Sequence, residues 1–254
     1  MKRIAAFVLV TFLCTSGAAQ ETKNNDPKAV GIITKMEELL NLENTDVTST
    51  FNLVQRKEGE ADRVLKIRVY RRDSAKKFTL VFQYPQSEKG KGYYRDGDNL
   101  YLYLPSTREF VFRNRKDDVG STDVRTDLFG KLDLLGQYRV EYIGSEQVAK
   151  VECDVIGLEA TALDVSFPVQ KWYIRKSDGL PMKVENFSAS NALLRTFFYI
   201  DYTEVKPGKF LFTKFMAVNN LQKNQKTLLT NDDVSGTPIP DYTFSQAYLE
   251  EQSR

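Results

Sequence analysis

Acidic side chains of this chain form three close pairs, a spacing that could hold a divalent cation or support acid-base chemistry. The pairs are Asp96 with Asp98, Asp117 with Asp118, and Asp232 with Asp233. The first pair begins like a calcium loop, but Leu100 and Tyr101 stand where the third ligand and the sharp-turn glycine belong. Asp96-Gly97 instead suits a type I′ hairpin turn, and the other pairs lie in polar connections. We predict no metal site and no cofactor.

Nucleophilic catalysis has little support in the sequence. The chain has no histidine, which removes Ser-His and Cys-His activation. Cys153 lies in an alternating segment between two acidic residues and has no histidine partner, so we interpret it as a structural thiol. Gly90-Lys91-Gly92 lacks the spacing of a phosphate loop. We predict no catalytic residue and conclude that the protein is not an enzyme.

The first nineteen residues have the composition of a secretory signal peptide. Two basic residues precede an apolar run over residues 4–14, which is too short to span a bilayer core about 30 Å thick. Gly17-Ala18-Ala19 supplies small residues for cleavage near Ala19. We therefore expect residues 1–19 to be removed and the mature protein to be periplasmic. Lipid attachment at Cys14 stays an alternative, although Leu13 stands where lipoprotein signals have a small residue.

Cleavage would leave a chain with balanced charge. It removes two of the 36 Lys and Arg residues and none of the 34 Asp and Glu residues, so both counts become 34. Binding of nucleic acid through bulk charge is therefore not expected. No repeat or boundary divides the remainder, and we expect residues 20–254 to form a single domain.

One helical pattern is followed by many strand patterns. Asp26-Pro27 is typical of a helix start, and apolar spacings of three and four continue to Leu42. After that, apolar and polar residues alternate between turn sequences. The pattern predicts about a dozen antiparallel strands, with cores near 46–56, 63–72, 77–84, 90–95, 99–104, 109–113, 138–146, 149–159, 169–175, 181–188, 195–206, 209–219 and 225–234. We expect short helices within residues 123–135 and a last helical turn capped by Ser245.

A sheet of this width cannot stay flat. It should curl into a barrel or part-barrel, with a few helices packed on one face. Its interior is filled either by helices or by an apolar ligand, and composition alone leaves both alternatives open.

The segment Gly90-Lys91-Gly92-Tyr93-Tyr94-Arg95-Asp96-Gly97-Asp98-Asn99-Leu100-Tyr101-Leu102-Tyr103-Leu104-Pro105-Ser106 resembles the outer-membrane lipoprotein-sorting family of LolA/LolB-like proteins. Tyr101 stands where the similar branch often has Trp. The likeness extends from the Asp-Pro helix to Phe244 and Leu249, whereas residues 120–127 depart from the pattern of that branch.

This resemblance implies a mainly β fold of the α+β type, a strongly curved, unclosed antiparallel barrel of about 11 to 13 strands covered by a few helices. It also implies a periplasmic carrier that binds lipid or lipoprotein acyl chains in an apolar cavity and transfers them between envelope membranes. The resemblance implies an envelope exporter or an outer-membrane acceptor as its partner. The alternative is a sensor on the same fold that binds a lipid or lipopeptide and signals to a membrane partner. Fold alone does not choose between them.

We expect the apolar faces of the first strands to line the ligand cavity. The residues predicted to bind the ligand are Leu65, Ile67, Phe78, Leu80, Phe82, Leu100, Leu102, Leu104 and Phe110. Each has an ordinary core interpretation as well. Release of a ligand requires a movable cover, for which we consider the helix of residues 26–42 and the segment 123–135.

Overall fold

The computed structural model describes residues 24–114 and 116–254, so the predicted signal peptide lies outside the described residues. The helices in this part of the chain are α1 (Pro27–Leu40), α2 (Leu134–Gln137) and α3 (Gln246–Gln252), with 3₁₀ helices η1 (Asp73–Ala75), η2 (Val119–Ser121), η3 (Thr126–Phe129) and η4 (Asp241–Phe244). In the described ranges, no helix is both long enough and apolar enough to cross a membrane.

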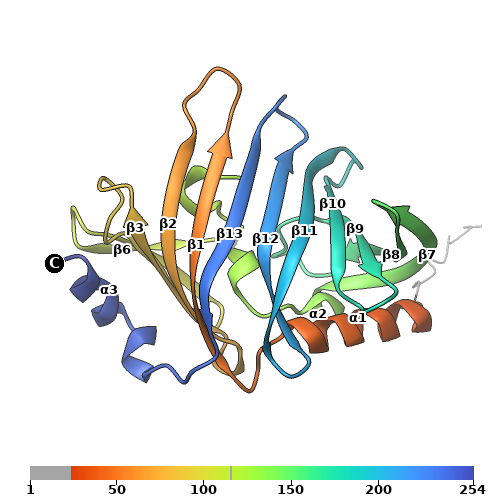
Figure 1. Cartoon of the computed structure of the whole chain (residues 1–254), viewed down its shortest axis with the longest axis horizontal. Coiled ribbons are helices and arrows are strands. Elements are labelled where there is room, and N and C mark those ends of the chain that lie inside the picture. The colour runs from red at the N-terminus through yellow and green to blue at the C-terminus, as the bar shows by residue number, and fades with distance from the viewer. Residues whose placement is uncertain (1–23, 115) are drawn as a thin grey trace, which may run out of the picture.

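Within the described residues, thirteen strands pair in one antiparallel sheet. They are β1 (Asp46–Arg56), β2 (Arg63–Arg72), β3 (Lys77–Tyr84), β4 (Gly92–Asp96), β5 (Asn99–Leu104), β6 (Glu109–Arg113), β7 (Tyr138–Val148), β8 (Val151–Ala160), β9 (Val169–Arg175), β10 (Pro181–Phe187), β11 (Leu193–Lys206), β12 (Lys209–Asn219) and β13 (Lys226–Ser235). Their order is β6-β5-β4-β3-β2-β1-β13-β12-β11-β10-β9-β8-β7. The predicted fold class, an unclosed and curved antiparallel sheet with few helices, is confirmed (Figure 1).

The two edges of the sheet are consecutive in sequence. β6 forms one edge and β7 the other, and all the strands between them pair with neighbours. The connection from one edge to the other is described at residues 114 and 116–137, which we call the crossing segment (Figure 1, yellow-green). Because this connection passes over one face of the sheet, the sheet curves around it.

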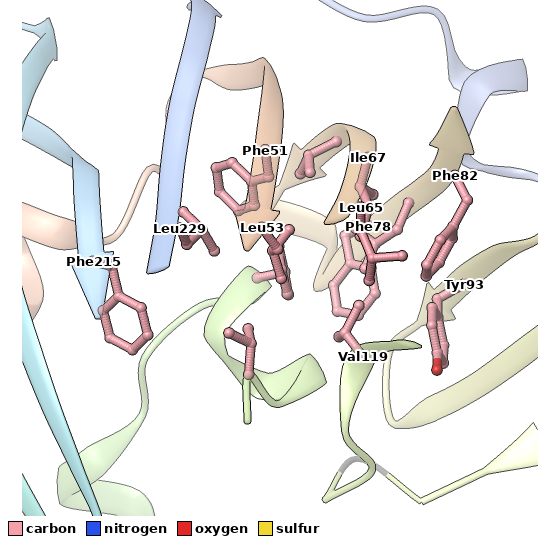
Figure 2. Packing of buried hydrophobic residues seen from close by; sticks show 14 of the residues in the cluster. Phe51, Leu53, Leu65, Ile67, Phe78, Phe82, Tyr93, Val119, Phe215 and Leu229 are labelled. Carbon is pink, nitrogen blue, oxygen red and sulfur yellow. The ribbon is translucent and has the colours of Figure 1, made fainter. Parts of the chain in front are cut away.

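We call the face that carries Leu65, Leu80 and Phe215 the inner face. On β1 to β5, the inner face packs against Val119 and Phe129 of the crossing segment, forming one large core cluster. In Figure 2, Val119 points toward the side chains of the sheet. The outer face of β3 to β5 is instead covered by the C-terminal η4 and α3.

Helix α1 packs on the inner face at the other half of the sheet. The Asp26 side chain accepts hydrogen bonds from the amides of Lys28 at 2.8 Å and Ala29 at 3.2 Å, and Pro27 takes the first turn, as the sequence predicted. The helix buries an apolar stripe against β7 to β10, made of Ala29, Ile33, Met36 and Leu40. The expected cap of the last helix also holds, because the Ser245 hydroxyl accepts from the Tyr248 amide.

Helix α1 ends two residues earlier than predicted, for an electrostatic reason. After Leu40 the backbone becomes extended at Asn41, and the Leu42 amide donates to Asp73 Oδ2 at 2.7 Å. Asp73 also forms a bidentate pair with Arg71, with Nε to Oδ1 at 2.6 Å. The Asp73 and Arg71 side chains are only 1% and 8% exposed. Burial would raise the pKa of Asp73, but the Arg71 charge and these hydrogen bonds outweigh it and hold the pKa below its ordinary value.

Asp73→Asn should therefore destabilise the protein by about 3 to 5 kcal/mol near neutral pH, because Arg71 is left buried without its counter-charge. The stabilisation is present above the unfolded pKa of 3.8 and is lost as pH falls through the lower folded value. Denaturant unfolding of both proteins should thus show a constant difference down to about pH 5 and a shrinking one below pH 4. Asp62→Asn, at an exposed pair, is the control and should leave the midpoint unchanged. A difference that grows on acidification would contradict this account.

Candidate functional site

The crossing segment is anchored to the sheet by one buried carboxylate. Asp123 is 2% exposed. Five polar side chains at one end of four neighbouring strands surround it. Four of them donate hydrogen bonds at 2.8 to 3.2 Å, from Gln55, Asn219, Gln225 and Thr227. The fifth, Arg195, forms an ion pair at 3.4 Å. A carboxylate has about four acceptor positions, so this set satisfies it. The segment is therefore fixed to the sheet at this point.

A close backbone approach fixes the preceding turn. Gly120 has φ of +57°, and a Cβ there would lie 2.7 Å from Leu65 Cδ1 and 3.1 Å from Phe82 Cε1. Only glycine accepts both this conformation and this space without a shift of its neighbours. The backbone of the crossing segment thus fills the inner face of β2 and β3.

Beyond the anchor, the segment bridges a cavity. Residues 124–137, which we call the cover, lie over a space of about 120 Å³ between the two core clusters. The strands supply Trp172, Phe197, Tyr199 and Phe215 to its walls. Phe197 and Tyr199 pack against both clusters, so the cavity lies at the seam between them. The remaining lining residues are Arg95, Lys116, Val124, Arg125, Asp127, Leu128, Lys131, Leu132, Asp133, Leu134, Gln137, Tyr138, Asp164, Val165, Ser166, Phe167 and Gln170.

A second, smaller cavity lies behind the cover. It measures about 40 Å³ and is lined in part by Leu40 of α1 and by Phe210 and Phe212. Leu128, Leu132 and Tyr199 line both spaces. Displacement of these two leucines would therefore join the cavities into one channel along the inner face.

The volume of the cavity limits which ligands can enter it without a movement of the cover. An apolar cavity of roughly 150 Å³ holds a molecule the size of benzene. A space of about 120 Å³ is therefore too small for a long acyl chain. A lipid ligand requires the cover to move.

The cover is tied to the end of α1 by polar contacts. Asn41 Nδ2 donates to the Leu132 carbonyl at 2.9 Å, and the Leu132 amide donates to Asn41 Oδ1 at 2.8 Å. The Leu134 amide donates to Glu37, and Lys131 pairs with Glu43. These contacts are more exposed to water than those at Asp123, so each of them is a weaker attachment than the buried anchor. At the far end of the cover, Thr161 and Ala162 also donate hydrogen bonds to the Gln137 carbonyl.

Asp127 introduces a charge into the cavity. Its side chain is exposed to solvent and also lines this space, where it accepts a hydrogen bond from the Ser166 hydroxyl. The protein atoms around it raise its pKa by desolvation, and the hydrogen bond from Ser166 and the nearby charge of Arg125 lower the pKa only in part. Burial and then repulsion from Asp127 raise the pKa of Tyr199 and of Tyr138. The cavity therefore has aromatic walls and charged lining residues of both signs.

The nine predicted ligand-binding residues lie mostly in the packed core. Seven belong to the cluster beneath η2 and η3, each at most 7% exposed: Leu65, Ile67, Phe78, Leu80, Phe82, Leu100 and Leu102. Leu104 packs at the margin of that cluster. None of the nine lines either cavity beneath the cover. Their contact with a ligand stays a prediction that depends on movement of residues 119–129.

Phe110 was predicted to lie on the inner face with the other eight residues, and the structure corrects this prediction. The register pairs Phe110 with Tyr103 and Val111 with Leu102. Since paired residues share a face, Phe110 lies on the outer face, where its ring centroid is 4.8 Å from that of Tyr103. Short strands with apolar residues in succession, here Phe110-Val111-Phe112, do not reveal their register in sequence.

The observed wall residues were missed for a related reason. Phe197, Phe198 and Tyr199 are consecutive aromatics in β11, and burial along this strand does not alternate. The sequence feature that could have revealed these residues is the break in alternation, which indicates a strand with both faces partly covered. Trp172, the single tryptophan, could also have been considered.

The fold places the protein in a known structural class. A LolA superfamily protein from Nitrosomonas europaea superposes with a TM-score of 0.75 at 18% identity, covering 87% of this chain and 98% of the other. A putative outer membrane lipoprotein-sorting protein domain from Vibrio parahaemolyticus gives 0.79 at 17%, covering 88% and 98%. A DUF1329 family protein from Desulfovibrio piger gives 0.79 at 15%, covering 89% and 100%. The chain therefore has the LolA-like fold.

Sequence comparison identifies the family itself. A family model described as "Uncharacterized protein" matches residues 74–251, and the chain belongs to that family. No curated protein matches the chain in sequence.

Core and cavity positions should respond differently to truncation. Phe82→Ala, in the packed cluster, should cost about 3 to 5 kcal/mol, because it leaves a void among close-packed neighbours. Leu128→Ala, between the two cavities, should cost less than about 2 kcal/mol, because part of its surface already faces empty space. Chemical unfolding measures both values. Equal costs would mean that the seam is packed as tightly as the core.

Proposed function

We propose that the protein is a non-enzymatic carrier that binds lipid or lipoprotein acyl chains beneath the cover and transfers them between envelope membranes. The observation that supports this is the aromatic cavity at the seam of two separately packed clusters, closed by a segment with one strong anchor and one weaker attachment. The signal-like residues 1–19 support work in the periplasm. The LolA-like fold supports a carrier role by analogy.

Partition supplies the driving force in this mechanism. Transfer of a CH₂ group out of water is worth about 0.8 kcal/mol, so a 16-carbon chain offers roughly 12 kcal/mol before the costs of binding. Binding displaces Leu128 and Leu132 and joins the two cavities. Return of the cover provides the state of lower affinity from which the chain is released.

Protein purified from its own envelope should contain bound lipid. Native mass spectrometry should detect one or two non-covalent adducts of acyl-chain mass, and delipidated protein should move labelled phospholipid between vesicles. Trp172 lines the cavity and is the only tryptophan, so its fluorescence should change on loading. Absence of adducts, of transfer and of a Trp172 response would refute the carrier proposal.

Loosening the cover should speed exchange. Asn41→Ala removes both hydrogen bonds to Leu132 without altering a cavity wall. We expect labelled lipid to enter and leave several-fold faster, and the amides of residues 128–135 to exchange faster with deuterium. The matched control is Asn52→Ala, since Asn52 donates one exposed hydrogen bond to Asp232. Unchanged lipid kinetics in Asn41→Ala would mean that this contact does not limit opening.

A further inference from the structure

Strand β6 ends the sheet with an exposed apolar edge. Among the described residues it pairs with β5 alone, so the other side of its backbone has no strand beside it (Figure 1). Every second residue of such a strand directs its N–H and C=O groups away from the sheet. Phe112 is 64% exposed and Val111 is 36% exposed, although both side chains are apolar. An edge of this kind is a site at which a further strand can pair.

The opposite edge of the sheet is protected. β7 carries the charged residues Arg139 and Glu141, and its register with β8 shifts between Tyr142 and Gly144. Charged side chains and bulges are the usual means by which an edge strand avoids a partner. The register of β6 with β5, in contrast, is continuous. Addition of a strand is therefore favoured at β6 and disfavoured at β7.

The sequence of β6 is complementary to itself in the antiparallel direction. Glu109 and Arg113 stand at equal distances on either side of Val111, and so do Phe110 and Phe112. When two β6 strands pair with Val111 opposite Val111, each Glu109 faces the Arg113 of the other copy. Each Phe110 likewise faces the Phe112 of the other copy. Opposite charges and aromatic pairs directly across two strands stabilise a sheet, and here each pair forms twice.

The aromatic rings of the outer face continue across such a junction. Tyr94 of β4 stacks on Tyr101 of β5 with ring centroids 6.4 Å apart, and Tyr101 meets the ring of Phe112 edge-on at 5.8 Å. This row of rings ends at the edge of the sheet with the exposed Phe112. Phe110 lies on the same face, 4.8 Å from Tyr103. In the pairing described above, Phe110 and Tyr103 of the second copy extend the row beyond Phe112.

The charge of Arg113 is available for this pairing. Arg113 Nε lies 2.7 Å from Asp117 Oδ2, and the two side chains are 39% and 29% exposed. An ion pair so exposed to water contributes little to stability. Exchange of Asp117 for Glu109 of a second copy therefore costs the chain little.

We propose that two copies of this protein pair through antiparallel β6 strands, so that their two sheets join into one across a twofold axis at Val111. The strand has five residues, so the contact is small and the dimer forms and separates with concentration. The inference goes beyond the carrier proposal and does not depend on it.

Sedimentation velocity of the mature protein over a range of concentrations measures the dimer. Glu109→Arg and Arg113→Glu each place like charges opposite one another twice, so each variant alone should dimerise about tenfold more weakly than wild type. An equimolar mixture of the two variants should dimerise like wild type, because every Arg then faces a Glu. Glu141→Arg, on the other edge strand, is the matched control and should leave dimerisation unchanged.

Disulfide formation tests the register of the two strands. Residues opposite each other in antiparallel strands have Cα atoms about 4.5 to 5.5 Å apart, which suits a disulfide. Val111→Cys should therefore form a covalent dimer on mild oxidation. Glu141→Cys places an exposed thiol on β7 and should form little, and wild type should form none because Cys153 is buried.

The outcomes decide the inference in both directions. A wild-type protein that stays monomeric would leave β6 to a strand of another protein and would overturn the proposal. A charge-variant mixture that dimerises no better than either variant alone, or equal crosslinking of Val111→Cys and Glu141→Cys, would also overturn it. Circular dichroism confirms that each variant is folded. The presence or absence of bound lipid bears on the carrier proposal alone.

Discussion

Burial of the Asp123 carboxylate is the constraint on which the rest of this architecture depends. An ionised carboxylate without partners in a protein interior costs several kcal/mol, so it is placed there only where its donors already stand. Those donors lie at one end of β1, β13, β12 and β11, the centre of the sheet. The crossing segment must therefore pass over the inner face at this point. There the segment packs on the inner face and lines the cavity between the two core clusters.

This anchor also divides the inner face into two unequal parts. On one side, Gly120 and Phe129 bring the backbone and side chains of the segment against β1 to β5, where they join one packed cluster. On the other side, α1 covers β7 to β10 with its apolar stripe. The two packed regions meet along β11 and β12, where the cover spans the gap with a few polar contacts. The cavity is thus a consequence of how the segment crosses and needs no separate explanation.

The sequence predicts the strands well and the site poorly, for physical reasons. Alternation in β2 or β3 follows directly from one buried and one exposed face, and the Asp26-Pro27 start of α1 is a local capping effect. The anchor is a different kind of feature, because Asp123 meets Gln225 across 102 residues and Gln55 across 68. Nothing local distinguishes these side chains from solvated ones. The same limit applies to the nine residues from Leu65 to Phe110: their apolar character was evident, but which half of the inner face stays open depends on where the segment crosses.

The energy needed to open the cover has a consequence for chain length. Exposing Leu128 and Leu132 costs about 1.5 to 3 kcal/mol each, or roughly 3 to 6 kcal/mol together, if nothing replaces their contacts. A chain of six carbons recovers about 5 kcal/mol by leaving water, which barely matches that cost. A chain of sixteen carbons recovers roughly 12 kcal/mol and leaves a clear surplus. Under the carrier proposal, a cavity of about 120 Å³ therefore favours long chains, because the free energy of their transfer out of water exceeds the cost of displacing the two leucines.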